Sequence, residues 1–252
     1  MTELTEPTRK WWASALLVGG VIGLLCLPLA ALGTKVGLWT YALGIPMMGV
    51  GAVLATMVFF LGIVAYVVCI SRGYQVERSS IFIGVALSVL VLAISLTQFN
   101  AARSVPPIHN ISTDTENPPQ FDKIVAVRET QGAENPLEYD VEALAQTQRG
   151  AYPQLQPLVS AVSQAKMLEN AVNVLEGMGM EVVDVNPSAG RVEATDTTFW
   201  FGFKDDVLVQ IREYEDASLA EVRSVSRVGV SDLGANAARI YRILDELKKI
   251  DA

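Results

Sequence analysis

The chain has 252 residues, of which 51% are hydrophobic and 18% charged, and 27 Asp and Glu against 19 Lys and Arg give a formal net charge of −8. The charges are unevenly distributed: residues 11–98 contain only four of them, whereas residues 99–252 contain 38. Soluble domains carry about 25% charged residues along their whole length, so this distribution excludes a simple soluble enzyme and a disordered chain. The presence of only two cysteines also excludes a disulfide-stabilised scaffold.

Three uncharged runs in the first part of the chain reach or approach the length of about 20 residues that crosses a bilayer. They occupy residues 11–33, 38–70 and 81–98. The second run is too long for one untilted helix and too short for two, so we expect residues 38–45 to form an interfacial lead-in, with Pro46 near a kink. The sequence therefore predicts a membrane domain over residues 1–98 with three transmembrane helices, at about residues 11–33, 44–70 and 81–98.

Basic residues beside the spans predict their orientation, because cytoplasmic loops of membrane proteins are enriched in Lys and Arg. With the N-terminus inside, the cytoplasmic side receives four basic residues and the far side two: Arg9, Lys10, Arg72 and Arg78 against Lys35 and Arg103. We therefore expect residues 99–252 outside the cytoplasm, which in a bacterium means an inner-membrane protein with a periplasmic domain. The first run is too long for a signal-peptide core, so we expect it to be retained.

The spans contain no Asp, Glu, Lys, Arg or His. Ionisable groups within a bilayer usually mark ion or proton pathways, so the sequence favours an anchor over a pump. The spacing of Gly19 with Gly23 and of Gly51 with Ala55 would allow close approach of helices, within the chain or in a dimer. Both cysteines lie in the apolar runs as expected packing residues, so the external part has no cysteine for a disulfide, a nucleophile or a zinc site.

The external part begins with a segment rich in proline, residues 99–121. Its pairs Pro106–Pro107 and Pro118–Pro119 favour extended backbone and prevent a continuous helix. We expect an ordered extended strap here, followed by mostly irregular structure over residues 122–160.

Helical and strand-like patterns follow this strap. Apolar spacing predicts a helix that includes Leu168 and Leu175, capped by Ser160 or Ser163, and a last helix that includes Leu233 and Leu247. Strand-like runs lie between them, at Glu181–Val185, Arg191–Thr197, Phe199–Phe203, Val207–Arg212 and Ala220–Arg227. This order predicts an α+β fold class: a three-helix membrane region, then an external domain over residues 122–252 with an antiparallel sheet and two packing helices.

The densest group of polar residues extends from a strand end into the start of the last helix. Helix N-termini attract anions, and arginine binds carboxylate or phosphate through two parallel hydrogen bonds. The candidate anion site consists of Arg223, Arg227, Ser231, Asn236 and Arg239. A structural network is the alternative, in which Ser231 and Asp232 cap the helix and Asp232 is an internal partner of the arginines.

His109, the single histidine, lies in the strap five residues before Asp114. A histidine oriented by a carboxylate can act as a general base, so a hydrolase-like enzyme that uses His109, Asp114 and Asp196 is one hypothesis. A structural role, with His109 or Asp114 hydrogen-bonded to backbone, is the other. No cluster with metal-ligand spacing and no nucleotide-binding loop is present, so we expect no metal and no cofactor.

Aromatic residues alternate over Phe199–Phe203, a pattern that usually packs against a sheet face. We expect these residues in the core, with a binding groove or a membrane-facing patch as the alternative. Residues 99–252 carry 14 basic and 24 acidic residues, a net charge of −10 that opposes binding to nucleic acid.

Four segments in order resemble the domain-of-unknown-function family fourteen-ninety-nine. They are Pro106–Asp114 with Pro118–Phe121, Arg191–Gly202, Lys204–Asp206 and Arg223–Arg239. The resemblance implies a bacterial, membrane-associated protein whose spans precede the domain, and it implies no established activity. Family members often have Asp after the histidine of the first motif, where this chain has Asn110.

The sequence thus favours a multi-pass membrane protein with a non-catalytic external domain that binds a partner protein or a small anionic ligand. The expected partners are the lipid bilayer and either another membrane protein or a second copy of the chain. The hydrolase-like enzyme and a structural subunit of a membrane complex remain the alternatives.

Overall fold

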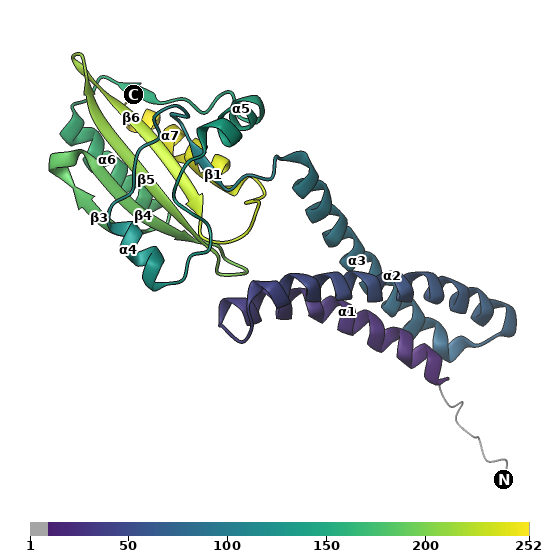
Figure 1. The fold of residues 1–252 in the computed structure, drawn as a ribbon. Helices are drawn as coiled ribbons and strands as arrows, with labels where there is room; N and C mark the ends of the chain where they lie inside the picture. The colour runs from purple at the N-terminus through teal and green to yellow at the C-terminus, as the bar shows by residue number, and fades with distance from the viewer. Residues whose placement is uncertain (1–9, 252) are drawn as a thin grey trace, which may run out of the picture. The chain divides into compact units, whose positions relative to one another are not determined.

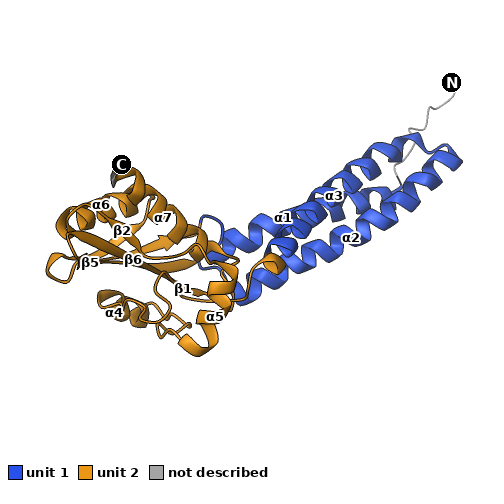
Figure 2. Ribbon diagram, turned by 90° about the horizontal axis from the view of Figure 1, so that it is seen from above, with its two compact units in different colours: residues 1–101, 199–202 blue, residues 102–198, 203–252 orange. Residues whose placement is uncertain are grey.

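The protein is represented by a computed structural model that describes residues 10–251, so Arg9, one of the basic residues used to predict orientation, lies outside the described residues. The chain forms two compact units (Figure 2): residues 1–101 with 199–202, and residues 102–198 with 203–252. We describe each unit separately.

The first unit is built from three long helices, α1 (Trp11–Lys35), α2 (Tyr41–Arg72) and α3 (Gln75–Ser104). Within the described residues, these three helices are long and apolar enough to cross a membrane. Each is longer than the predicted span, since α3 continues to Ser104 instead of ending near Gln98. The lead-in expected over residues 38–45 is helical from Tyr41 onward, with Pro46 inside α2. An apolar segment gains by being helical because the helix satisfies its own backbone hydrogen bonds.

Glycines bring the three helices into close contact. A Cβ atom added to Gly20 would lie 2.7 Å from the carbonyl oxygen of Gly84, and one added to Gly51 would lie 3.0 Å from that of Gly23. The small residues Gly23, Gly51 and Ala55 thus lie where α1 meets α2 of the same chain. In this structure they serve packing within the unit.

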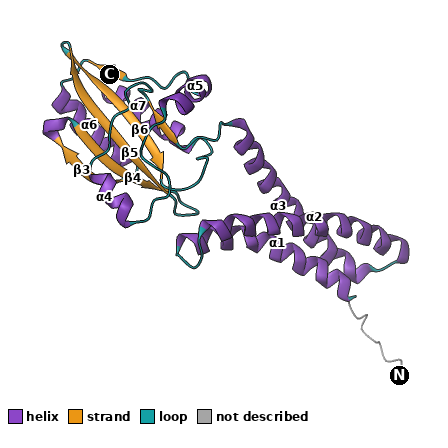
Figure 3. Ribbon diagram, in the orientation of Figure 1, coloured by secondary structure: helices purple, strands orange, loops and turns teal. Residues whose placement is uncertain are grey.

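The second unit is an α+β domain, which confirms the predicted fold class (Figure 3). Its helices are α4 (Lys123–Thr130), α5 (Val141–Ala151), α6 (Gln164–Gly177) and α7 (Ala235–Asp251), with a 3-10 turn η1 (Pro187–Ala189). Its strands are β1 (Asn110–Ser112), β2 (Leu158–Ser160), β3 (Glu181–Asn186), β4 (Arg191–Thr197), β5 (Lys204–Tyr214) and β6 (Ala217–Ser226). Ser163 caps α6 by accepting a hydrogen bond from the backbone N–H of Lys166.

The prediction of irregular structure over residues 122–160 is wrong, since α4, α5 and β2 lie there. The buried residues of α4 are Ile124 and Arg128, and those of α5 are Ala145 and Gln148. A buried arginine and a buried glutamine look like surface residues in a search for hydrophobic periodicity. The helical pattern was therefore hidden by polar residues at core positions.

The strands form one antiparallel sheet in the order β1-β6-β5-β4-β3, with β2 also paired to β6 (Figure 1). The prediction that Phe199–Phe203 forms a buried strand is wrong, because these residues connect β4 to β5. The backbone N–H of Thr198 donates to the carbonyl oxygen of Phe203 at 2.8 Å and closes the loop, and Gly202 has a φ of +70°. Phe199 and Trp200 are 73% and 57% exposed.

The two faces of the sheet differ in chemistry. Helices α6 and α7 cover one face and α4 lies on the other (Figure 2). The main apolar core lies under α6 and α7, where side chains such as Val192, Val207, Val209 and Val222 alternate inward along the strands. The strap begins after Ser104 and adds β1 to the edge of β6, and the face that it helps to cover carries mostly polar side chains.

A buried charge network on both faces of the sheet

Two consecutive aspartates near the start of β5 organise the polar contacts of the domain. Asp205 and Asp206 are 3% and 0% exposed. Successive side chains of a strand point to opposite faces. Asp206 accordingly meets Arg128 of α4, whereas Asp205 meets Arg239 of α7. The sheet therefore carries a buried ion-pair cluster on each face.

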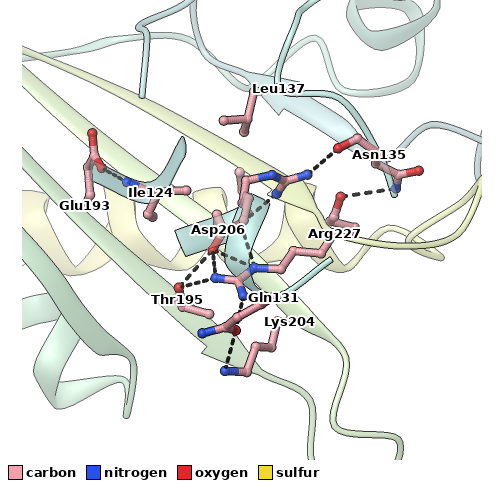
Figure 4. A network of polar contacts seen from close by, with 12 residues as sticks. Ile124, Gln131, Asn135, Leu137, Glu193, Thr195, Lys204, Asp206 and Arg227 are labelled. Carbon is pink, nitrogen blue, oxygen red and sulfur yellow. Dashed lines mark hydrogen bonds and ion pairs between the residues drawn. The ribbon is translucent and has the colours of Figure 1, made fainter. Parts of the chain in front are cut away.

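On the face of α4, one carboxylate holds two guanidinium groups (Figure 4). Arg128 Nη1 donates to Asp206 Oδ2 at 2.6 Å, and Arg227 Nη2 donates to Asp206 Oδ1 at 2.7 Å. The hydroxyl of Thr195 donates to the same Oδ1 at 2.8 Å. Both arginines are 4% exposed. Burial lowers the pKa of Arg128, and the hydrogen bond and charge of Asp206 partly oppose this effect.

Neutral acceptors complete this cluster. Gln131 Oε1 accepts from Arg227 Nη1 at 2.5 Å and from Lys204 Nζ at 3.2 Å, and the carbonyl oxygen of Asn135 accepts from Arg128 Nη2 at 2.5 Å. Glu193, which is fully buried, accepts the backbone N–H groups of Asp122 and Ile124 at the start of α4. These contacts hold α4 and the following residues 131–135 against the sheet.

On the face of α7, Arg239 pairs with two carboxylates. Its Nη2 lies 2.7 Å from Asp205 Oδ2 and 2.7 Å from Asp196 Oδ2. Its Nη1 donates to Asn236 Oδ1 at 2.6 Å and to Ser224 Oγ at 3.0 Å. Arg239 thus ties the last helix to the ends of β4, β5 and β6.

Arg223 is fully buried on the face of α4 and makes its contacts with neutral groups. It donates to Asn110 Oδ1 at 3.2 Å, to the carbonyl oxygen of Pro119 at 2.9 Å and to that of Leu137. The rings of Phe121 and Tyr139 lie 5.4 and 5.8 Å from its guanidinium carbon. No carboxylate in the described part of the chain forms an ion pair with it. Burial lowers the pKa of Arg223 to about 10.

This arrangement predicts the effect of a carboxylate next to Arg223. In Asn110→Asp, the new charge replaces a neutral acceptor 3.2 Å from the guanidinium nitrogen Nε, and the hydrogen bond that Asn110 Nδ2 donates to the carbonyl oxygen of Glu138 is lost. The guanidinium lowers the pKa of the new carboxyl in the folded state, so the added stability is present above its unfolded pKa and is lost as the pH falls through the folded pKa. We expect the free energy of unfolding of the variant, relative to the parent chain, to rise by about 1 kcal/mol between pH 3 and pH 7. Denaturant titrations of both chains at pH 3 and at pH 7 measure this difference in unfolding free energy. A constant difference between the two chains would contradict this account.

The start of α7 is capped by the chain itself. Asp232 accepts the backbone N–H of Gly234 at 2.8 Å and that of Asn236 at 2.9 Å, and Ser231 Oγ accepts that of Leu233 at 3.2 Å. This is the capping arrangement that the sequence offered as the structural alternative. Asp232 is not the partner of the three arginines, whose acceptors lie on other residues.

Burial raises the pKa of Asp232 from the ordinary value of 3.8, and the two backbone hydrogen bonds partly oppose this shift. The stability linked to its proton is therefore present below pH 3.8 and is lost as the pH rises through the folded pKa. In Asp232→Ser one hydroxyl oxygen retains part of the cap, and the titrating group is removed. We expect the parent chain to gain stability relative to the variant as the pH falls from 7 to 4, which parallel thermal melts measure. If the parent chain instead lost stability relative to Asp232→Ser between pH 7 and pH 4, the pKa of Asp232 would be lowered by folding and this account would be wrong.

The five residues of the candidate anion site do not surround one ligand position. Arg223 and Arg227 contact groups on the face of α4, whereas Asn236 and Arg239 belong to α7 on the opposite face. Asn236 accepts from Ser224 and Arg239 and donates to Ser226, so its amide is also used internally. The geometry matches the structural network better than a shared anion site.

The three residues of the hydrolase hypothesis have separate partners. His109 Nδ1 lies 3.3 Å from the carbonyl oxygen of Val230, and Asp114 accepts the backbone N–H groups of Glu116 and Asn117. Asp196 pairs with Arg239. Over residues 10–251 no hydrogen bond joins any two of the three, and no group of three or more His, Cys, Asp and Glu could hold a metal ion.

Sequence reasoning missed the residues that organise both clusters, Arg128, Thr195, Asp205 and Asp206. One signal was available: two adjacent aspartates directly precede the apolar residues Val207–Val209 in a strand-like run. Consecutive strand residues face opposite sides, so at least one of the two had to lie in the core and required a cation.

Comparison with known proteins agrees with the motifs in the sequence. A protein-family model described as "Protein of unknown function (DUF1499)" matches residues 110–247, from β1 to the last turns of α7. No curated protein matches the chain. The family match spans more than half of the chain and includes both ion-pair clusters, so this protein belongs to the DUF1499 family, with three apolar helices before the family domain.

Proposed function

We propose that this protein is a membrane-anchored, non-catalytic module whose C-terminal domain binds a partner protein outside the cytoplasm. The carrying observation is that three carboxylates of its motifs pair with arginines of the same domain: Asp206 with Arg128 and Arg227, and Asp205 and Asp196 with Arg239. Side chains already neutralised inside the domain are poor candidates for chemistry or for anion binding. We therefore expect a partner protein to bind the surface of the domain and not its buried charged residues.

The open edge of the sheet is the surface that we expect the partner to use. β3 is the end strand, and within the described residues its strand partner is β4. A groove of ≈ 240 Å³ runs beside it, lined by residues that include Leu168 and Val172 of α6 and Val185 of β3. Extended peptides bind such edges by main-chain hydrogen bonds and place side chains in adjacent pockets. An extended segment of the partner is therefore the expected occupant.

Affinity purification of the full chain from membranes in mild detergent tests this proposal. Val185→Lys places a charge at the groove, and Val125→Lys on α4 is its matched control, since the two valines are 40% and 39% exposed. We expect one protein to co-purify with the parent chain and with Val125→Lys, and to be lost from Val185→Lys. A partner retained by Val185→Lys would contradict the assigned surface. Recovery of a bound small anion without a protein would favour the ligand hypothesis.

The orientation is tested separately. We propose that α1, α2 and α3 cross the bilayer with the N-terminus in the cytoplasm, which three spans and the distribution of basic residues support. A reporter active only outside the cytoplasm, fused after residue 252, should be active. Activity of a cytoplasm-specific reporter at the same position would overturn the orientation.

A further inference from the structure

The two edges of the sheet differ in how far the chain itself covers them. At one edge, the side chain of Gln148 in α5 occupies the outer side of β1: its Oε1 accepts the backbone N–H of Ser112 at 3.1 Å, and its Nε2 donates to the carbonyl oxygen of Ser112 at 2.6 Å. At the other edge (Figure 1), β4 is the strand that pairs with β3 within residues 10–251. An edge strand directs backbone N–H and C=O groups away from its neighbour. β3 is therefore the edge that can accept an added strand.

A strand added to β3 would place its side chains alternately in two different surroundings. On the face of α6 lies the groove lined by Leu168, Val172 and Val185. On the opposite face lies Asp184 of β3, which pairs across the ladder with Glu193. Directly opposed residues of an antiparallel pair share a face, and Glu193 accepts the backbone N–H of Ile124 at the start of α4. One side of the added strand would therefore meet apolar side chains and the other a carboxylate.

Asp184 differs from the paired aspartates of the domain. Its Oδ2 atom is buried, and no donor among the described residues forms a hydrogen bond with it. Its cross-strand neighbour Glu193 is also a carboxylate, and the nearby Arg191 pairs with Asp122 at 2.7 Å and with Glu193 at 3.4 Å. A buried carboxylate oxygen without a donor costs free energy. The residue as a whole is only partly buried, so its carboxylate can be reached from the edge.

We propose that the partner segment that pairs with β3 is a basic strand, in which Lys or Arg alternates with apolar residues. The inference rests on the proposed function, because it names the chemistry of the occupant of that same edge. The apolar side chains fill the groove, and a basic side chain opposite Asp184 supplies the missing cation. Glu181 adds an exposed carboxylate at the start of β3, whereas Glu169 beside the groove already pairs with Lys166 at 3.0 Å.

Charge also argues against a second copy of the chain as the occupant. Two copies paired through β3 would each bring Glu181 and Asp184 to the same interface. Like charges that face one another across strands are destabilising. Residues 99–252 carry a net charge of −10, so two such domains repel each other as a whole. A basic partner segment has the opposite relation to this edge.

Peptide binding to the full chain in an uncharged detergent tests the proposal. The probes are three end-blocked peptides of about eight residues, the length of an ordinary strand. In them Val alternates with Lys, with Thr or with Glu, and each carries an uncharged fluorophore for fluorescence anisotropy. We expect the Lys peptide to bind about tenfold more tightly than the Glu peptide, with the Thr peptide between them. Added salt should weaken the binding of the Lys peptide and leave that of the Thr peptide unchanged.

Three variants locate the contact. Asp184→Asn should weaken the Lys peptide about fivefold, the effect of one cross-strand charge pair, and leave the Thr peptide unchanged. Glu142→Gln is the matched control, since it also removes one negative charge but lies exposed on α5, the helix that covers the opposite edge. It should leave the binding of all three peptides unchanged. Val185→Lys should weaken the Lys and Thr peptides alike, because it places a charge in the groove that both require.

The outcomes separate the charge preference from the edge itself. Equal affinity for the Lys and Thr peptides, or unchanged affinity of Asp184→Asn for the Lys peptide, would overturn the basic strand. The edge would still stand if Val185→Lys weakened the Thr peptide. Absence of binding by every peptide, or binding that Val185→Lys does not change, would reject the edge and the basic strand together. A dimer of the parent chain that Val185→Lys dissociates, measured by light scattering, would assign the edge to a second copy.

Discussion

Asp206→Asn should destabilise the C-terminal domain by about 3–5 kcal/mol, the usual cost of removing one partner from a buried ion pair. Asp206 is fully buried and is the carboxylate that both Arg128 and Arg227 contact. The amide keeps the shape of the side chain but removes its charge, so two guanidinium groups remain in the interior without a counter-charge. Denaturant unfolding of the full chain in detergent, followed by hydrogen exchange at the amides of β5 and β6, measures the loss.

Asp245→Asn is the matched control for this substitution. Asp245 forms an exposed pair with Lys249 on α7, and exposed pairs contribute between about 0 and 1 kcal/mol. We expect little change in the unfolding free energy of this variant. A loss below about 1 kcal/mol for Asp206→Asn would mean that the arginines find other acceptors, and the cluster would then not be the organising contact of that face.

Arg239→Ala should cost about as much, roughly 3–5 kcal/mol, because it leaves Asp205 buried without a cation. The same change removes the hydrogen bonds to Ser224 and Asn236. Asp196 is less affected, since its side chain is 31% exposed and water can solvate it. Thermal melting of the full chain and hydrogen exchange in α7 report the effect, which should be largest at the start of that helix.

Arg242→Ala on the exposed side of the same helix is the control and should be nearly neutral. The comparison also separates the two roles considered for the arginines. A structural network requires a large loss of stability in Arg239→Ala. An unchanged melting temperature combined with loss of bound inorganic phosphate in a titration would instead establish an anion site.

Two predictions of local structure were wrong, over residues 122–160 and over Phe199–Phe203. The helix α4 buries Ile124 and Arg128, and the β4–β5 connection exposes Phe199 and Trp200. Both cases reverse the usual relation between residue type and burial. They share a physical cause, because the burial of a side chain depends on partners that are distant in the sequence: Arg128 is buried where Asp206, 78 residues away, accepts its hydrogen bond.

The candidate anion site grouped residues that the fold separates. The sequence indicated that Arg223, Arg227 and Arg239 belong to one polar group, because they lie within 17 residues of each other. Strand geometry then separated them, since Arg223 and Arg227 point to the face of α4 while α7 brings Arg239 to the other face. Closeness in sequence did not translate into closeness in space because a β-sheet lies between.

The sequence by itself determined the three apolar helices, the boundary between apolar and charged parts, the α+β class and the family. Each depends on local composition, on periodicity or on a motif, and these can be recognised without knowing what each residue contacts. Only the tertiary structure decided the partners of the charged residues. Asp205 and Asp206 are neighbours in the chain, yet they bind arginines from opposite faces that lie 34 and 78 residues away. The energy of a buried charge depends on those distant partners, which the local pattern does not contain.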